Sequence, residues 1–461
     1  MRHVTLRVEP GGSGRDFADG AIGFSIEDAE LETQDLSASH GSLVALMRLL
    51  GPGVLRVGGN SLDVSWWTSG NEPRPAWATY VITPADLVRL RGLLVAAHWR
   101  VILGVDLGHF DPSRAADEAV IAERTLGSRL LGFEAGNEPD SYGNPPSALR
   151  PSTYGAASYL QELGAYTAAI RAEVPAMRLF GPDLSNLDWL PTIAADKQTS
   201  IDVITQHFYP TTYSFSSGVC SATSVPTALD LLSPQVRALE DGELRALAAA
   251  GKIAHRETWI SETNTTSSCD ANGGPETSPV FASALWSLDW ALRSASSGVS
   301  GIDFHGWVGS CGADAFSPTC ASTEADMARG SVTPRPEYYG LFAARQLEGG
   351  HFLPVQIGKR ASDDLTAYAT LHADRVITVA IDNVSKTRSV ALSLQVPGYA
   401  TATEETLTAP SIGATHGVTF GGASFNLTGG LRSKTTPAPK VNGGFQLQVA
   451  PASAYIVTVL R

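Results

Sequence analysis

The chain has 461 residues, 43% of them hydrophobic and 17% charged, which describes a globular protein with enough apolar side chains for a large core. Its formal net charge of −13 argues against nucleic acid or an anionic membrane as a partner, because both require clustered Lys and Arg side chains. No segment approaches the roughly 20 unbroken apolar residues of a membrane span. One barrel of roughly 250 residues or more, with one smaller domain, fits this length.

The N-terminal segment 4–8 alternates apolar and polar residues like a half-exposed strand, and a glycine-rich turn follows at 10–14. We expect this strand to join strands at the C-terminal end of the chain. From residue 21 onward, short apolar runs alternate with amphipathic segments. The pattern predicts strands at 21–27, 54–60, 101–106, 130–138, 177–181, 201–209, 258–262 and 302–307, and helices at 42–50, 83–99, 113–125, 154–173, 187–195, 232–250, 281–294 and 337–347.

The number of these units predicts the architecture. Eight strand-helix units close a (β/α)8 TIM barrel, which we place at 15–348. Helical periodicity disappears beyond this point, and short β-branched runs are separated by Gly, Pro and Asn turns. This sequence pattern predicts an antiparallel β-sandwich domain formed by 349–461 together with 1–14.

Two glutamates follow apolar runs at the ends of predicted strands four and seven, Glu138 and Glu262. The C-terminal ends of the strands form the catalytic face of such a barrel, so the two carboxyl groups should meet there. A retaining glycosidase needs a carboxylic acid and a nucleophilic carboxylate about 5 to 5.5 Å apart. We therefore predict Glu138 as the acid and base, Glu262 as the nucleophile, and Asn137 as the residue that holds the substrate 2-hydroxyl.

A series of motifs identifies a family that the chain resembles. The segments 24–27, 55–60, 206–209 and 336–340, with the Asn-Glu pair before Pro139, resemble glycoside hydrolase family 79, the β-glucuronidase and heparanase family. The resemblance implies that Glu27 and Asn60 hold sugar hydroxyls and that Tyr209 hydrogen-bonds the nucleophile. Asp63 is a weaker candidate, equally well explained as a surface residue or a helix cap.

Three more side chains lie at predicted strand ends. His207 and His305 are as well explained by structural roles as by ligand binding. Trp307 could form a stacking wall for a sugar ring, and a core position explains it nearly as well.

The loop after Glu262 departs from the family pattern. The resemblance implies backbone N–H groups there, helped by a glycine or tyrosine, that bind a uronate carboxylate. In this chain residues 263–270 are Thr, Asn, Thr, Thr, Ser, Ser, Cys and Asp, whose hydroxyl and amide donors could still bind a carboxylate. We predict a retaining exo-β-glucuronidase that acts on small or terminal β-glucuronides without a metal or organic cofactor. A retaining β-glucosidase or diglycosidase for an uncharged glycoside is the alternative, and a non-catalytic sugar-binding protein is the third hypothesis.

The four cysteines lack the spacing of a zinc site, which favours disulfides over metal binding. Of the three possible pairings we favour Cys311–Cys320 and Cys220–Cys269, with four free thiols as the alternative. The N-terminus does not resemble a signal peptide, but we expect a secreted or periplasmic protein. Because Asn264 begins a glycosylation sequon beside the predicted nucleophile, we expect a bacterial source. The oligomeric state stays open.

Overall fold

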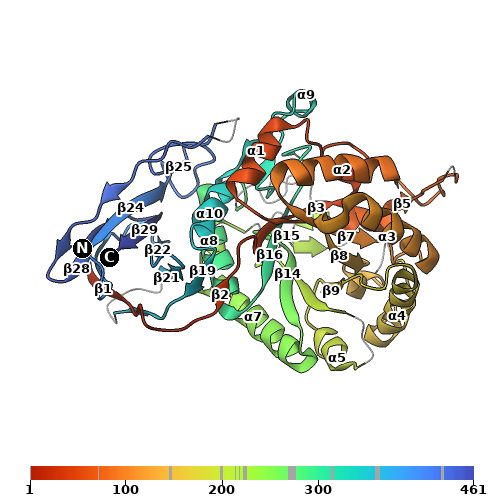
Figure 1. Cartoon of the computed structure of the whole chain (residues 1–461), viewed down its shortest axis with the longest axis horizontal. Coiled ribbons are helices and arrows are strands. Elements are labelled where there is room, and N and C mark those ends of the chain that lie inside the picture. Colours follow the sequence, from red (N-terminus) through yellow and green to blue (C-terminus); the bar gives the residue numbers. More distant parts are fainter. Residues whose placement is uncertain are drawn as a thin grey trace.

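The computed structural model describes residues 2–70, 72–144, 148–197, 201–212, 214–216, 219–221, 226–267, 277–312, 316–358, 364–426 and 430–461. A helix-wrapped barrel and a C-terminal β domain lie side by side, and both chain termini lie in the β domain (Figure 1). Within the described residues, no helix is long and apolar enough to cross a membrane.

The barrel is a closed sheet of eight strands in which every neighbouring pair is parallel. This confirms the predicted (β/α)8 fold. In chain order the strands are β3 (Ile22–Glu27), β4 (Val54–Gly58), β7 (Arg100–Val105), β8 (Leu130–Ala135), β9 (Leu179–Leu184), β10 (Val203–Phe208), β14 (Glu257–Thr263) and β16 (Gly301–Gly306). Glu138 therefore follows the fourth strand, and Glu262 lies in the seventh.

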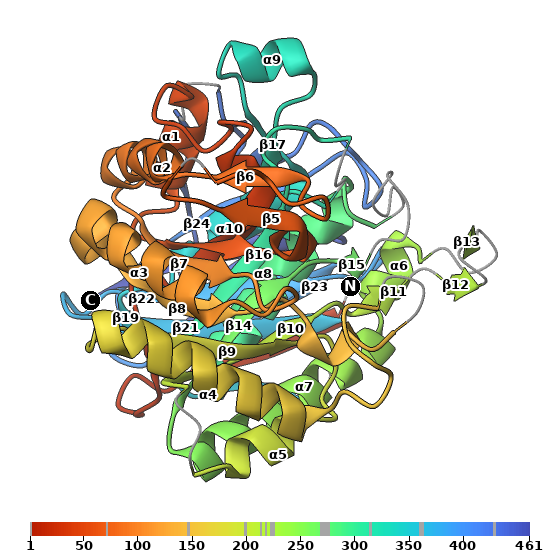
Figure 2. The same ribbon diagram turned by 90° about the vertical axis from the view of Figure 1, so that its right-hand side faces the viewer.

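Helices follow the strands along the outside of the barrel (Figure 2). They are α1 (Gly41–Leu49), α2 (Pro84–Ala97), α3 (Pro112–Leu126), α4 (Ala156–Glu173), α5 (Leu190–Ala195), α7 (Pro234–Ala254), α8 (Phe281–Ser297) and α10 (Pro336–Arg345). The start of α2 shows how the sequence sets these boundaries. Pro84 is its first residue, and the Asp86 carboxylate accepts a hydrogen bond from the Thr83 backbone N–H at 2.8 Å. Leu87, Leu90 and Leu94 recur at helical spacing and are fully buried.

Short strands and short helices lie in the loops that connect these strands and helices. They are η1 (Asp28–Leu31), η2 (Asn60–Val64), β5 (Ser65–Trp67), β6 (Tyr80–Ile82), η3 (Gly127–Arg129), η4 (Pro139–Ser141), β11 (Thr211–Thr212), β12 (Ser214–Ser216), β13 (Val219–Ser221), α6 (Ala228–Leu231), β15 (Thr266–Ser267), β17 (Thr319–Cys320), α9 (Glu324–Ala328) and β18 (Thr333–Pro334). β11 pairs with β15, so the loops after barrel strands six and seven are joined at the same end of the barrel (Figure 2).

The C-terminal domain contains two sheets, as the sequence predicts. One has the strand order β20 (Val355–Ile357), β1 (Arg2–Val8), β23 (Val390–Gln395), β28 (Gly444–Val449) and β27 (Lys440–Val441). The other has the order β2 (Asp16–Phe17), β19 (Gly350–Phe352), β21 (Leu365–His372), β22 (Ile377–Asn383), β29 (Ser453–Leu460), β24 (Thr401–Thr408) and β25 (Thr419–Phe420), with β26 (Thr436–Pro437) beside β24.

The N-terminal residues contribute to both sheets. β1 pairs with β23, and this pair is parallel in an otherwise antiparallel sheet. β2 pairs with β19, although our proposed barrel domain begins at residue 15. We keep 15–348, and 1–14 with 349–461, as the proposed domain division.

The larger sheet packs against both domains, because successive side chains along its strands point to opposite faces. In β29, Tyr455, Val457 and Val459 pack in the core between the two sheets, whereas Ala454 and Ile456 join the hydrophobic cluster of the barrel. Both faces of this sheet are therefore buried, and the barrel core continues into the β domain through α8 and α10.

Candidate active site

A cavity of about 430 Å³ lies where the C-terminal ends of the barrel strands meet, in the size range of ligand pockets. Its walls come from loops after strands that are far apart in sequence. The lining residues are Glu27, Asn60, Glu138, Ser185, His207, Tyr209, Glu262, Ser267, His305 and Phe316. Both predicted catalytic glutamates therefore face one cavity.

Glu138 and Glu262 are close to each other in this cavity. A carboxylate oxygen of each, together with a ring nitrogen of His207, lie within 4.8 Å of one another. The Glu138 side chain is 22% exposed and the Glu262 side chain is 8% exposed. The two carboxyl groups are therefore close enough to act on the same glycosidic bond.

Glu262 is held as a carboxylate. Arg56 Nη1 donates a hydrogen bond to its Oε2 at 2.7 Å, and the Tyr209 hydroxyl donates to its Oε1 at 2.8 Å. Burial by itself raises the pKa of this carboxyl group, but the facing His305, His207 and Arg56 and the Tyr209 hydrogen bond hold the pKa well below its usual range. An ionised carboxylate at this position can act as a nucleophile.

Arg56 is a fully buried residue of the second barrel strand, and it organises the site beneath the cavity. Its guanidinium also donates to Glu134 Oε2 at 2.7 Å and to Asn137 Oδ1 at 2.9 Å. Gly58 makes room for it, since a Cβ there would lie 2.6 Å from the Arg56 Cζ. Sequence reasoning did not assign Arg56 a role, although an arginine inside an apolar barrel strand is a signal of a buried partner.

His207 connects both glutamates to Asp183. Its Nδ1 lies 3.1 Å from Glu138 Oε1, and its Nε2 lies 3.5 Å from Asp183 Oδ1. Burial lowers the pKa of this histidine, but the Glu262 charge and the hydrogen bonds to Asp183 and Glu138 raise it to about 10. His207 is therefore an imidazolium at neutral pH, with one ring N–H directed at Glu138 Oε1 and the other at Asp183 Oδ1.

Glu27 and Asn60 form the opposite wall of the cavity. The Glu27 carboxylate accepts hydrogen bonds from the backbone N–H groups of Asn60 and Ser61 at 3.2 and 2.7 Å. Gly59, with a φ of +74°, allows this close turn, because a Cβ there would lie 2.5 Å from the Glu27 Cδ. Asn60 Oδ1 accepts a hydrogen bond from Asn137 Nδ2 at 3.2 Å, so three of the five predicted sugar-binding residues lie together.

The comparisons with known proteins identify the C-terminal domain first. Residues 367–456 match the family described as Glycosyl hydrolase family 79 C-terminal beta domain. The chain carries the C-terminal domain of glycoside hydrolase family 79. This match confirms the predicted resemblance to family 79 over the C-terminal domain, and that family is one of glycoside hydrolases. No curated protein sequence matches the chain.

Solved glycoside hydrolases share the whole fold. A 4-O-α-L-rhamnosyl-β-D-glucuronidase from Fusarium oxysporum 12S, in complex with Rha-GlcA, has a TM-score of 0.77 at 18% identity, with 98% of this chain and 100% of that chain covered. A GH51 arabinofuranosidase from Xanthomonas axonopodis pv. citri has a TM-score of 0.71 at 13% identity, with 100% of each chain covered. A GH family 44 xyloglucanase from Paenibacillus polymyxa has a TM-score of 0.64 at 10% identity, also with 100% of each chain covered. At these identities the likeness shows the fold.

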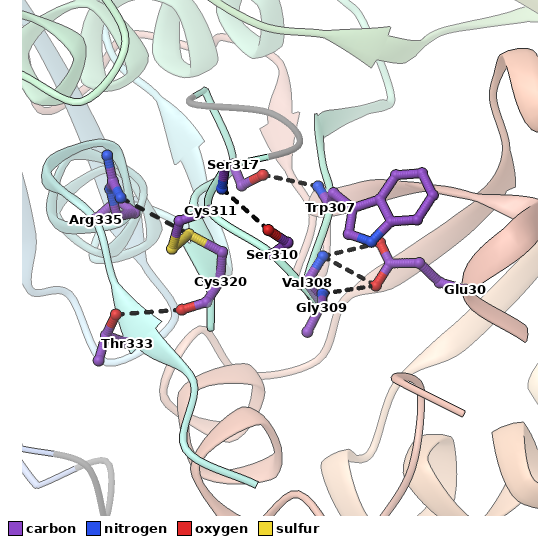
Figure 3. The surroundings of a disulfide bond; sticks show 11 residues. Glu30, Trp307, Val308, Gly309, Ser310, Cys311, Ser317, Cys320, Thr333 and Arg335 are labelled. Atoms are coloured by element: carbon purple, nitrogen blue, oxygen red, sulfur yellow. Dashed lines mark hydrogen bonds between the residues drawn. A yellow bond between two sulfur atoms is a disulfide. The ribbon is translucent and has the colours of Figure 1, made fainter. Parts of the chain in front are cut away.

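Trp307 and Asp63 are not among the residues that line the cavity in the described part of the chain. The Trp307 backbone N–H donates to Ser317 Oγ at 2.7 Å, and the backbone N–H groups of Val308 and Gly309 donate to the Glu30 carboxylate (Figure 3). The Asp63 carboxylate accepts a hydrogen bond from the Tyr142 hydroxyl at 2.7 Å. The stacking role of Trp307 therefore stays a prediction.

Phe316 supplies an aromatic wall that sequence reasoning missed. Its ring lies 6.0 Å from the His305 ring and 6.2 Å from the Tyr209 ring. It belongs to the loop that the Cys311–Cys320 disulfide closes (Figure 3). No periodic pattern marks a residue in such a loop, so only the folded chain brings it to the cavity. The other favoured pair, Cys220–Cys269, falls outside the described side chains.

The loop after Glu262 directs its first side chains inward. Thr263, Asn264 and Thr265 are completely buried. Asn264 Nδ2 donates to the carbonyl oxygens of His305 and Phe316 at 2.7 and 2.8 Å. These donors therefore support the loops instead of facing a substrate, while Ser267 lines the cavity and 268–276 lie outside the described residues. The bacterial source stays a prediction.

Proposed function

We propose that this glycoside hydrolase is a retaining exo-β-glucuronidase that acts on small or terminal β-glucuronides. The observation that carries the proposal is the close pair of Glu138 and Glu262, with oxygens within 4.8 Å of one another and Glu262 held in its ionised form. The presence of both carboxyl groups in one cavity argues against a non-catalytic sugar-binding protein.

The arrangement supports a double displacement. The Glu262 carboxylate attacks the anomeric carbon while the protonated Glu138 donates its proton to the leaving oxygen, which breaks the glycosidic bond and forms a glycosyl-enzyme ester. Glu138 then takes a proton from water, whose oxygen attacks the same carbon and displaces Glu262. Glu27, Asn60 and Asn137 are proposed to hold the sugar hydroxyls, and Tyr209 to keep the nucleophile ionised and oriented.

The glucuronide is proposed from two observations. The C-terminal domain is that of family 79, and the structural neighbour from Fusarium oxysporum is a 4-O-α-L-rhamnosyl-β-D-glucuronidase. The imidazolium of His207, which lines the described cavity, supplies a positive charge that favours an anion. The disulfide between Cys311 and Cys320 supports an exported protein, since such bonds persist in oxidising compartments.

A neutral β-glucoside or a disaccharide unit is the second candidate. Among the residues that line the cavity in the described part of the chain, none is Lys or Arg, and the side chains of Thr263 and Asn264 are turned away. Both features would suit an uncharged sugar.

The test compares the hydrolysis of p-nitrophenyl β-glucuronide with that of p-nitrophenyl β-glucoside by the purified protein. A preference of about tenfold or more for the glucuronide supports the first proposal, and the reverse preference supports the second. The first sugar product observed by NMR should be the β-anomer, and Glu262→Gln should abolish turnover with either substrate. An α-anomer as first product, or an active Glu262→Gln variant, contradicts the retaining mechanism.

A further inference from the structure

The turn that carries Glu138 has a backbone that side-chain-bearing residues rarely adopt. Gly136 has a φ of +86°, and Glu138 has φ +47° and ψ 53°, in the left-handed region. Such a conformation persists only where the surrounding contacts over-determine it. The contacts on both sides of this turn therefore decide where the Glu138 carboxylate points.

Hydrogen bonds hold the backbone N–H and carbonyl groups of Glu138. The Glu138 N–H donates to the Asp183 carbonyl oxygen at 2.9 Å. The Glu138 carbonyl oxygen accepts hydrogen bonds from the Ser141 N–H at 2.8 Å and the Ser141 hydroxyl at 2.7 Å. These bonds fix the N–H and carbonyl groups of Glu138. The N–H group of the preceding residue, Asn137, has a different hydrogen-bond partner.

A buried tyrosine supplies that partner. The Tyr142 hydroxyl accepts a hydrogen bond from the Asn137 backbone N–H at 3.2 Å and donates one to Asp63 Oδ1 at 2.7 Å. Tyr142 is 2% exposed, so water does not compete for these bonds. A Cβ on Gly136 would lie 2.8 Å from the hydroxyl, which shows that Tyr142 packs directly against the turn.

Asp63 anchors this connection on a different part of the barrel. It lies in η2, which follows β4, whereas Asn137 and Glu138 follow β8. Neither Asp63 nor Tyr142 lines the cavity, so neither is available to bind the sugar. The two side chains connect the loop after the second strand to the turn after the fourth strand.

We propose that Asp63 and Tyr142 are positioning residues that hold the Glu138 carboxylate in its orientation toward the leaving-group oxygen, acting through the Asn137 N–H. The inference rests on the proposed function, in which Glu138 is the general acid. A displaced acid harms most the substrates whose leaving oxygen is strongly basic, because those need the proton in the transition state. Activated aryl leaving groups depart with little proton transfer.

The test uses Tyr142→Phe and Asp63→Asn, which remove the bridging hydroxyl and replace the carboxyl group by an amide with little change in side-chain shape. Tyr154→Phe is the matched control, since its hydroxyl also donates to a carboxylate, Glu162 Oε2 at 2.8 Å, and its ring stacks with Tyr142 at 6.3 Å. We expect Tyr142→Phe to lower kcat about 10- to 100-fold on an alkyl β-glycoside and less than about threefold on the p-nitrophenyl β-glycoside of the same sugar. Tyr154→Phe should change both rates by the same small factor.

Two outcomes would overturn the proposal: equal losses on both substrates in Tyr142→Phe, or a profile the same as that of Tyr154→Phe. Hydrogen exchange of the segment 133–142, followed by mass spectrometry, provides a readout that needs no activity. Exchange should be faster in Tyr142→Phe than in the wild type and in Tyr154→Phe, and unchanged exchange overturns the positioning role. If Glu138→Ala shows no leaving-group selectivity, the proposed function is refuted instead. The hydrogen-exchange result would then still test whether Tyr142 holds the segment 133–142 in place.

Discussion

Arg56 Nη1 and Glu262 Oε2 lie 2.7 Å apart, and the arginine that makes this contact is completely buried in the second barrel strand. The same guanidinium contacts Glu134 and Asn137, so one cation orders the proposed nucleophile and a proposed sugar-binding residue from below. Removal of this cation would leave two buried carboxylates without their closest positive partner.

We expect Arg56→Met to lower kcat/KM by about 100-fold or more, because the ionised Glu262 loses a direct charge-assisted hydrogen bond. Since Arg56 helps to hold the pKa of Glu262 down, its loss raises that pKa, and the acidic limb of the kcat/KM profile should move to higher pH. Arg56→Lys retains one charge and should show a smaller shift. A lower rate with an unmoved acidic limb would contradict the electrostatic role.

We expect the free energy of unfolding to fall at alkaline pH because His207 loses its proton there. Its pKa rises from the ordinary value of 6.5 to about 10 in the folded chain, so its contribution to stability is complete below about pH 6.5 and is lost as the pH rises through 10. A buried shift of this size corresponds to roughly a few kcal/mol in the free energy of unfolding. Thermal unfolding should show a deficit for His207→Gln at pH 7 that narrows by pH 10.

The exposed His416 offers a matched control for this measurement. His416→Gln should follow the wild-type unfolding temperature across the same pH range. If the deficit of His207→Gln stays constant from pH 7 to pH 10, protonated His207 does not stabilise the site.

We expect a side chain at position 59 to collide with Glu27. Gly59→Ala would place a Cβ 2.5 Å from the Glu27 Cδ at a φ of +74°. Gly443→Ala is matched in backbone conformation, with a φ of +81°, but meets no atom within 4 Å. We expect Gly443→Ala to lower the free energy of unfolding by about 1 to 2 kcal/mol with normal activity, from backbone strain alone. Gly59→Ala should cost more stability and raise KM, since Glu27 must move. Equal stabilities of the two variants would contradict the collision.

The Cys311–Cys320 disulfide should act on substrate binding through Phe316. The double variant Cys311→Ser with Cys320→Ser releases a short loop, which costs about 2 to 3 kcal/mol in the chain-entropy model. We expect a higher KM with a smaller change in kcat, because the Phe316 wall becomes less ordered while the two glutamates stay in place. Phe316→Ala should reproduce the KM change without the loss of stability. A normal KM in Phe316→Ala would show that the ring does not contact the substrate.

The order of elements was predictable because local physics determines it. Strand and helix periods, the proline at the start of α2 and the turn at Pro139 are all encoded within a few neighbouring residues. The observed strands β8 and β14 agree with the predicted positions of Glu138 and Glu262, because each apolar run must be buried in the barrel wall. Motif resemblance added Glu27, Asn60 and Tyr209, which all line the cavity.

Trp307 and Phe316 show where sequence reasoning stopped. Both follow the eighth strand, but Phe316, in the disulfide loop, is among the residues that line the cavity and Trp307 is not. The direction of a loop side chain depends on contacts with distant segments, here Asn264 and His305. No periodicity in the sequence reports such contacts.

The eight-unit barrel, the two-sheet C-terminal domain and the two glutamates at strand ends were predictable, since they follow from periodicity and local chain stereochemistry. The folded chain was needed to show that Arg56 contacts Glu262, that His207 contacts Glu138, and that Tyr142 joins Asp63 to the turn that carries Glu138. It was also needed to show that the side chains of Thr263 and Asn264 are buried. Those relationships join residues tens to hundreds of positions apart, and they arise only when the barrel closes and removes their charges and hydrogen-bonding groups from water.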